Sequence, residues 1–316
     1  MCESDERDIV RPDNDGQTMA RLTLTLLGGF RARLDAATPL TLPTRKAKAL
    51  LAYLALSPSS PQPRDKLASL LWGSTLETTA RTSLRQTLYA LRKCLRDAGP
   101  RLLVVDGESV SLDVAAVTVD VREFERHASE GTPSALAEAA ALYQGDFLDG
   151  LAVQEQPFED WLLGHRERLR EVALKCLGGL LTHQRTIGST DSAVQTALRL
   201  LELDPLQEPV HRALMQLYVE TGRRGSALRQ YQLCVATLQR ELRTEPEAET
   251  KALYQEILRG RSHVVADRHT EPIAALPARP IANPIFVPAN IWRITRSRRC
   301  TATLRLKIVQ RLSNGR

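Results

Sequence analysis

The stretch TTARTSLRQTLYALRKCLRDA, residues 78–98, decides how the N-terminal part of this chain folds. At 100° per residue one narrow stripe of this segment is apolar, which predicts an amphipathic helix. The stripe consists of Leu84, Leu88, Leu91 and Leu95. Cations, amides and hydroxyls cover the rest of the surface, and such side chains reach phosphates and base edges. The stretch therefore predicts a DNA-recognition helix.

The elements on either side of this helix extend the prediction to a whole domain. Residues 22–42 alternate in part and predict two or three short strands. Residues 44–56 and 64–72 have helical spacing, and 101–114 form two β-rich runs around the turn signal Asp106-Gly107. The order of strands, three helices and a hairpin is typical of a winged helix-turn-helix with an N-terminal sheet.

From Val121 onward the pattern is almost entirely helical. The expected helices cover 134–148, 157–186 (one helix or two), 191–203, 207–221, 224–243 and 247–258. The sequence also repeats at an offset of 34, because Gly188 matches Gly222 and Ser192-Ala193 matches Ser226-Ala227. This period is typical of tetratricopeptide-like helical hairpins, which stack because no single pair buries its apolar face. A generic helical bundle is the alternative.

Charge is distributed unevenly along the chain. The net charge is +6, and between residues 41 and 100 there are ten cations against three acidic residues. This asymmetry favours a polyanionic partner for the first block, although a charged run is more often only a solvated face.

Two terminal segments differ from the rest. Residues 1–21 are polar and acidic with no apolar core, which predicts a disordered leader rather than a secretion signal. Residues 261–316 are Pro-rich and then basic, which predicts a disordered tail with at most non-specific polyanion contact. No apolar run of about 18 residues occurs, so no membrane partner is expected.

The chain shows no pattern typical of an enzyme. Its five cysteines are widely spaced and form no CxxC pair, which predicts reduced thiols in a cytoplasm and no zinc site. HExxH, GxSxG and GxGxxG motifs are also missing from the sequence. We expect no catalysis, no cofactor and no metal.

Several strings in these segments resemble one family of regulators. LPTRKAKALLAYLAL (42–56), RDKLASLLW (64–72) and ARTSLRQTLYALRKCL (80–95) resemble the DNA-binding half of the antibiotic regulatory protein (SARP) family, an OmpR-type winged helix. The segment 121–258, with LYQGDFLDGL and WLLGHRERLREVAL, resembles the family's bacterial transcriptional activator domain. The resemblance covers about residues 22–260, and both halves stand in the family order.

The resemblance implies a cytoplasmic transcriptional regulator, more specifically an activator. Family members bind repeats in promoter DNA and recruit RNA polymerase, and the helical half supports dimerisation and partner contact. Larger relatives carry an ATPase module, but this chain has no GxxxxGK[ST] loop, so it resembles a shortened member without ATP dependence. Two alternatives stay open: a protein-interaction adaptor that has lost DNA binding, and a truncated, inactive relative.

The predicted fold is therefore mostly α: a winged helix with a small sheet over 22–120, then a tetratricopeptide-like all-α domain over 121–260. The DNA-contacting side chains expected on the recognition helix are Arg81, Thr82, Arg85, Gln86, Tyr89, Arg92 and Lys93. A phosphate clamp is expected where the first helix begins, at Thr44, Arg45, Lys46 and Lys48, and Arg101 is the candidate beside the hairpin. The alternative is that these residues only solvate a surface.

Overall fold

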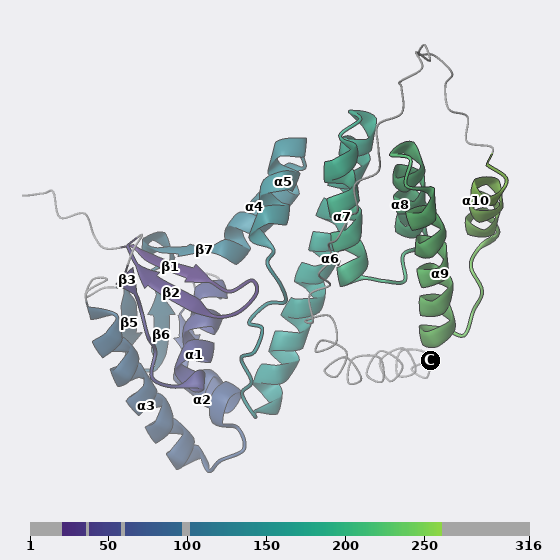
Figure 1. Cartoon of the computed structure of the whole chain (residues 1–316). Helices are drawn as coiled ribbons and strands as arrows, with labels where there is room; N and C mark the ends of the chain where they lie inside the picture. Colours follow the sequence, from purple (N-terminus) through teal and green to yellow (C-terminus); the bar gives the residue numbers. More distant parts are fainter. Residues whose placement is uncertain (1–20, 36–37, 58–60, 97–101, 261–316) are drawn as a thin grey trace, which may run out of the picture. The chain divides into compact units, whose positions relative to one another are not determined.

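The computed structural model describes residues 21–35, 38–57, 61–96 and 102–260 (Figure 1). The predicted tail 261–316, and the leader 1–21 apart from its last residue, lie outside the described residues. In the part described, short strands and three helices come first and a series of helices follows, so the predicted fold class is confirmed.

A four-stranded sheet opens the fold, with the order β3-β2-β1-β7. Its strands are β1 (Leu22–Thr25), β2 (Arg31–Leu34), β3 (Thr38–Pro39) and β7 (Val117–Val119). β1 pairs antiparallel with β2 and parallel with β7, where Leu24 lies opposite Val119. The first three strands were predicted. β7 was not, because its three residues become a strand only by pairing with β1, far away in the sequence.

The predicted order of three helices and a hairpin is confirmed. The elements are α1 (Arg45–Leu56), α2 (Arg64–Trp72), α3 (Glu77–Cys94), β5 (Leu103–Asp106) and β6 (Ser109–Leu112). Asp106 pairs with Ser109, so the hairpin turn is Gly107-Glu108, one residue later than predicted, and Gly107 has a φ of 38°. A short strand that the sequence did not indicate, β4 (Gln62–Pro63), pairs with β6.

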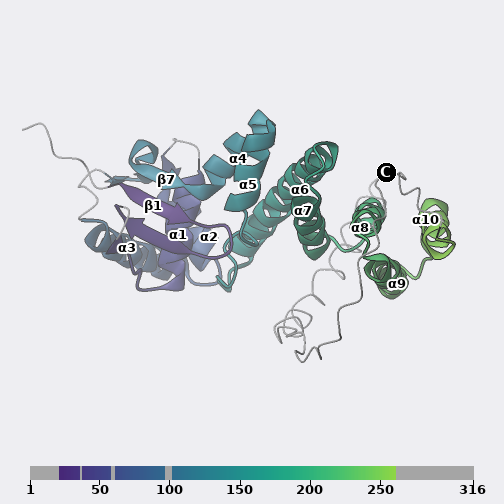
Figure 2. The ribbon, with the colours of Figure 1, turned by 45° about the horizontal axis from the view of Figure 1, so that its top comes forward.

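The second half consists of helices that pack in sequence as pairs (Figure 2). They are α4 (Asp120–Glu130), α5 (Pro133–Leu142), α6 (Gln156–Thr186), α7 (Thr190–Leu203), α8 (Glu208–Glu220), α9 (Arg224–Glu241) and α10 (Ala248–Leu258). The helix predicted over 134–148 is too long. It ends at Leu142, because the following segment runs beside the end of β1, where Leu148 donates its N–H to Leu26 and Gly28 donates to Asp146.

The 34-residue repeat has a physical counterpart in the backbone. Gly188 and Gly222 both have a φ of +71°, a left-handed conformation that favours glycine. The residues that follow them, Ser189 and Arg223, donate N–H bonds to carbonyls five residues earlier in each case. Two successive helical hairpins are thus closed by the same turn, as tetratricopeptide-like repeats require.

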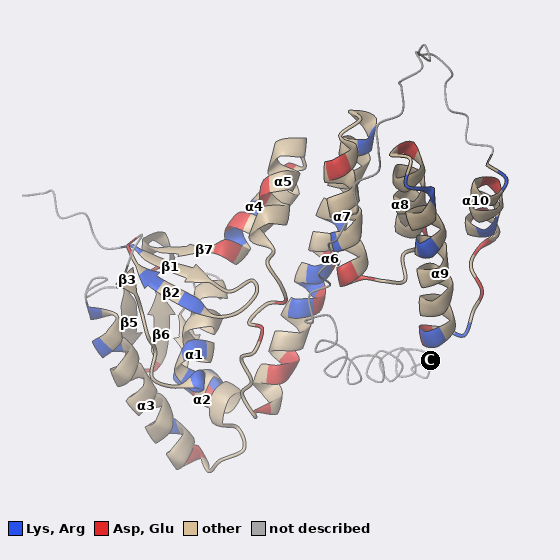
Figure 3. Ribbon diagram, in the orientation of Figure 1, with Lys and Arg blue, Asp and Glu red and all other residues tan. Residues whose placement is uncertain are grey.

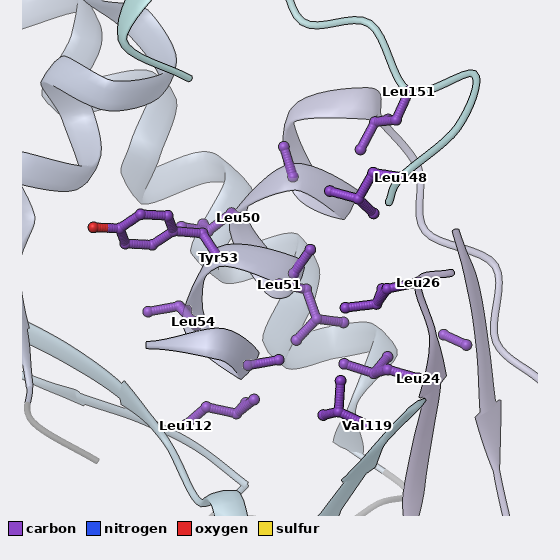
Figure 4. Close-up of a cluster of buried hydrophobic side chains, with 14 of the residues drawn as sticks. Leu24, Leu26, Leu50, Leu51, Tyr53, Leu54, Leu112, Val119, Leu148 and Leu151 are labelled. Carbon is purple, nitrogen blue, oxygen red and sulfur yellow. The ribbon is translucent and has the colours of Figure 1, made fainter. Parts of the chain in front are cut away.

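The main hydrophobic core is shared between the two halves of the chain. Its buried residues run from Leu22 in β1 to Cys176 in α6. Figure 4 shows Leu50, Leu51 and Leu54 of α1 among side chains from β1, β6, β7 and the segment after α5. The carboxylate of Asp120 also accepts the N–H groups of Leu26 and Leu27 at 2.8–2.9 Å. A domain boundary at 120/121 stays a prediction, and the core is continuous across it.

Candidate nucleic-acid interface

The outward face of α3 carries most of the predicted contact residues. Leu84, Leu88 and Leu91 are buried against the rest of the domain, and the side chains between them include the exposed Arg85, Gln86 and Tyr89. Tyr89 is 72% exposed, which is high for an aromatic residue in the middle of a helix. Figure 3 shows Lys and Arg at both ends of this helix.

Partners divide the predicted contact residues on α3 into two groups. Arg81 forms two hydrogen bonds with Asp65 of α2, at 2.9 and 3.2 Å, and pairs with Glu77 at 2.8 Å. These carboxylates raise the pKa of the Arg81 guanidinium, and the hydrogen bond that it donates to Asp65 is the largest cause. The hydroxyl of Thr82 donates to the carbonyl of Thr78, and Arg92 lies 3.5 Å from the carbonyl of Val105.

The second group has no partner in the part of the chain that the structure describes. Neither hydrogen bonds nor ion pairs engage Arg85, Gln86, Tyr89 or Lys93 there. These residues lie at i, i+1, i+4 and i+8 and therefore share one side of the helix. One side of α3 thus presents a guanidinium, an amide, a phenol and an ammonium to a ligand.

The beginning of α1 is more engaged than the sequence suggested. Thr44 is the N-cap of α1, since its hydroxyl accepts the N–H of Ala47 at 3.0 Å. Lys46 pairs with Glu155 at 2.9 Å and lies over the Trp72 ring, and Lys48 lies over the Phe30 ring. Among these described cations only Arg45 is both exposed and without such a contact.

The hairpin is fastened to α2 at its tip. Arg64 donates its backbone N–H to Glu108 at 2.9 Å and its guanidinium to the carbonyl of Gly107 at 3.0 Å. The tip itself carries two carboxylates, those of Asp106 and Glu108. Arg101, the predicted contact beside the hairpin, lies outside the described residues. Sequence reasoning missed the role of Arg64, because its partners are 43 residues away or more.

One buried residue beside the site that the sequence did not indicate is Glu155, which precedes α6. Its side chain accepts hydrogen bonds from Lys46 and from both the N–H and the hydroxyl of Ser74, at 2.9–3.0 Å. Burial opposes ionisation of this carboxyl, but the bonds from Lys46 and Ser74 outweigh it and leave its pKa lowered. Ser74 is 81 residues away in the sequence, so no local pattern could reveal the contact.

Within residues 21–260, apart from the short undescribed gaps, no three His, Cys, Asp or Glu side chains lie close enough together to hold a metal ion. No described helix is both long and apolar enough to cross a membrane.

Comparison with known proteins adds to this geometry. Residues 112–258 match the family model of the bacterial transcriptional activator domain. The transcriptional regulatory protein MoaR1 of Mycobacterium tuberculosis is 28% identical over 264 residues, which cover 77% of this chain and 81% of that protein.

A second relative is longer than the region it shares. The transcriptional regulatory protein EmbR of Mycobacterium bovis is 29% identical over 76% of this chain and 64% of its own length. A solved structure of M. tuberculosis EmbR, in complex with a low-affinity phosphopeptide, matches with a TM-score of 0.58 at 25% identity. That match covers 77% of this chain and 66% of the other. These similarities confirm the family resemblance seen in the sequence and agree with a role in transcription regulation.

Proposed function

We propose that this chain is a sequence-specific DNA-binding transcriptional regulator whose helix α3 enters the major groove. The observation that carries the proposal is the side of α3 formed by Arg85, Gln86, Tyr89 and Lys93, four exposed polar side chains without partners in the described part of the chain. A recognition helix needs donors free to meet base edges and phosphates. The activator domain and the named relatives support the same role.

Each side chain has a chemical task in this proposal. The planar fork of Arg85 suits the two acceptors of guanine, and the amide of Gln86 suits adenine. Lys93 and Arg92 both lie about two turns further along the helix than Arg85 and reach phosphates. Arg45, with the first N–H groups of α1, supplies a second phosphate contact. Arg101 is proposed as a further one.

The helical half supplies protein contacts in the same proposal. An open groove of about 490 Å³ lies between α8 and α10, with Arg212, Gln216 and Leu253 among its lining residues. Mixed polar and apolar linings of this kind suit a peptide segment, and solenoid-like arrays bind partners on such surfaces. We propose that this half contacts RNA polymerase or a second copy of the chain, so that the protein activates transcription at promoter repeats.

Genomic-fragment selection with the purified chain tests the function. The expected result is enrichment of duplexes that share a repeated sequence. Binding to the best fragment should weaken with salt, at a log–log slope of about −0.9 for each phosphate neutralised. Lys175→Ala controls for a general loss of positive charge and should bind like the wild type. Lys175 is an exposed cation on α6 with no partner among the described residues. No enrichment, or binding equally indifferent to sequence and salt, would reject DNA recognition and favour the adaptor alternative.

A further inference from the structure

Glu155 connects the helical half of the chain to the helix-turn-helix formed by α2 and α3. It is only 5% exposed, and it immediately precedes the first residue of α6. One carboxylate oxygen accepts the ammonium of Lys46 and the hydroxyl of Ser74, each at 2.9 Å, and the other accepts the Ser74 N–H at 3.0 Å. A buried carboxylate with three donors is fixed in place, because losing any one leaves charge unsatisfied.

Ser74, which donates two hydrogen bonds to Glu155, lies in the turn between α2 and α3. Gly73 makes the turn tight, since an added Cβ would lie 2.6 Å from the carbonyl oxygen of Ser69. Within the turn, Thr75 donates both its N–H and its hydroxyl to the carbonyl of Trp72. Among Gly73, Ser74 and Thr75, Ser74 is the one that forms hydrogen bonds with a distant part of the described chain, at Glu155. The direction in which α3 leaves the turn therefore depends on Glu155.

Packing around the contact leaves Glu155 little room to move. Lys46 lies between the carboxylate and the Trp72 ring, 5.1 Å from the ring centroid. One turn into α6, the Trp161 ring lies 5.1 Å from that of Tyr53 in α1, and Phe158 is fully buried. The start of α6 is thus seated on α1 and on the end of α2, so any shift of α6 is transmitted to the turn.

We propose that Glu155, at the start of the helical half, is a positioning residue for DNA recognition. It sets the orientation of α3 through its bonds to Ser74. It also holds Lys46 away from phosphates. The inference rests on the proposed function, because it concerns how the same helix is presented to DNA. It assigns Lys46, expected from the sequence to contact phosphate, to the internal contact instead. A positioning role predicts a change in sequence discrimination beyond any change in stability.

The test compares the affinity of the full chain for the selected duplex and for a scrambled duplex of the same length and composition. Glu155→Ala should lower the selected-to-scrambled affinity ratio by about tenfold, the cost of one charged hydrogen bond at the turn. Binding to the scrambled duplex should not weaken, because phosphate contacts do not need an exact helix angle and the released Lys46 becomes available to phosphates. Glu155→Gln should restore most of the ratio, since its amide oxygen still accepts the Ser74 N–H.

Glu159→Gln is the matched control, because Glu159 lies on the same turn of α6 and accepts the Val153 N–H without contacting α1 or the turn. Its ratio should equal that of the wild type. If Glu155→Ala does not fold by circular dichroism, Glu155→Asp decides by the same criterion, since its side chain is one methylene shorter and both of its bonds to Ser74 are lengthened. An unchanged ratio in the deciding variant overturns the inference. A wild-type protein without sequence preference overturns the proposed function itself, which is a distinguishable failure.

Discussion

Arg85 of α3 and several arginines of the helical half have opposite surroundings. In the helical half, guanidinium groups donate to backbone carbonyls: Arg166 to Phe147 and Leu148, Arg199 to Tyr143, and Arg224 to Ile257. On α3, Arg85 has no partner among the described residues. All of these guanidinium groups carry the same charge. Those of the helical half bond to backbone carbonyls of the fold, whereas that of Arg85 stays available to a ligand. In the proposed function, DNA contact therefore depends on unoccupied donors and not on the number of cations.

The largest effect should come from removing the free donors of α3. Arg85→Ala/Lys93→Ala should weaken binding to the selected duplex by about 100-fold, because one base contact and one phosphate contact are lost together. The free energy of unfolding should stay unchanged, since neither side chain has a partner among the described residues. Fluorescence anisotropy and urea unfolding measure the two quantities. A double variant that binds like the wild type would place recognition elsewhere.

The opposite result is expected for an arginine of the helical half. Arg166→Met should lower the free energy of unfolding by about 2 kcal/mol, because two carbonyls lose a charged donor in a half-buried site. Lys175→Met, an exposed change on the same helix, should leave stability unaltered. Equal unfolding curves for both variants would show that the guanidinium bonds to Phe147 and Leu148 contribute nothing.

A smaller and pH-dependent effect is expected at His211, which is buried between α8 and α9. Its Nε2 lies 3.0 Å from the Pro205 carbonyl and its Nδ1 lies 2.7 Å from Gln230. Burial lowers the pKa of this imidazole, outweighing the Pro205 carbonyl and Glu208, which favour the charged form. The neutral ring suits this site, with Nε2 donating and Nδ1 accepting.

Because the folded protein binds this proton more weakly than the unfolded chain, stability is complete above the ordinary histidine pKa of about 6.5. It is lost as the pH falls from there through the lower pKa of the folded state. The loss should be smaller than that caused by Arg166→Met. His211→Gln should flatten the stability curve between pH 7 and 5 in denaturant titrations, and an unchanged slope would assign that pH dependence to other groups.

The smallest effect should separate two arginines one turn apart. Arg81→Met should change affinity for the selected duplex by less than about threefold, because Arg81 is already paired with Asp65 and Glu77 on an exposed surface. Arg85→Met is the comparison, and it should lose far more. If both variants lose equally, the ion pairs of Arg81 open on DNA and the distinction between occupied and free donors fails.

Local patterns were sufficient to predict most of the fold. The leucine stripe of α3 and the repeated glycines at 188 and 222 each depend on residues within a few turns of one another, so their spacing is visible in the sequence. β7 and the extended segment after Leu142 depend on pairing with β1, which lies more than 90 residues earlier. Periodicity carries no information about such partners.

The candidate site divides in the same way. Exposure of Arg85, Gln86 and Lys93 follows from the helix period, and the pairing of Arg81 with Glu77 could have been predicted from their i, i+4 spacing. The bond from Lys46 to Glu155 spans 109 residues and had no local signal. Contact of any of these residues with DNA remains a prediction.

Site-directed photo-crosslinking from α3 tests the recognition of DNA by this helix most directly. Tyr89 would be replaced by a photo-reactive phenylalanine, and Leu233 of α9, 55% exposed, would carry the same group in a matched protein. Irradiation with the selected duplex should join the Tyr89 position to defined bases within each repeat and leave the Leu233 position uncoupled. Crosslinks from Leu233 with none from Tyr89 would contradict the assignment of α3 as the recognition helix.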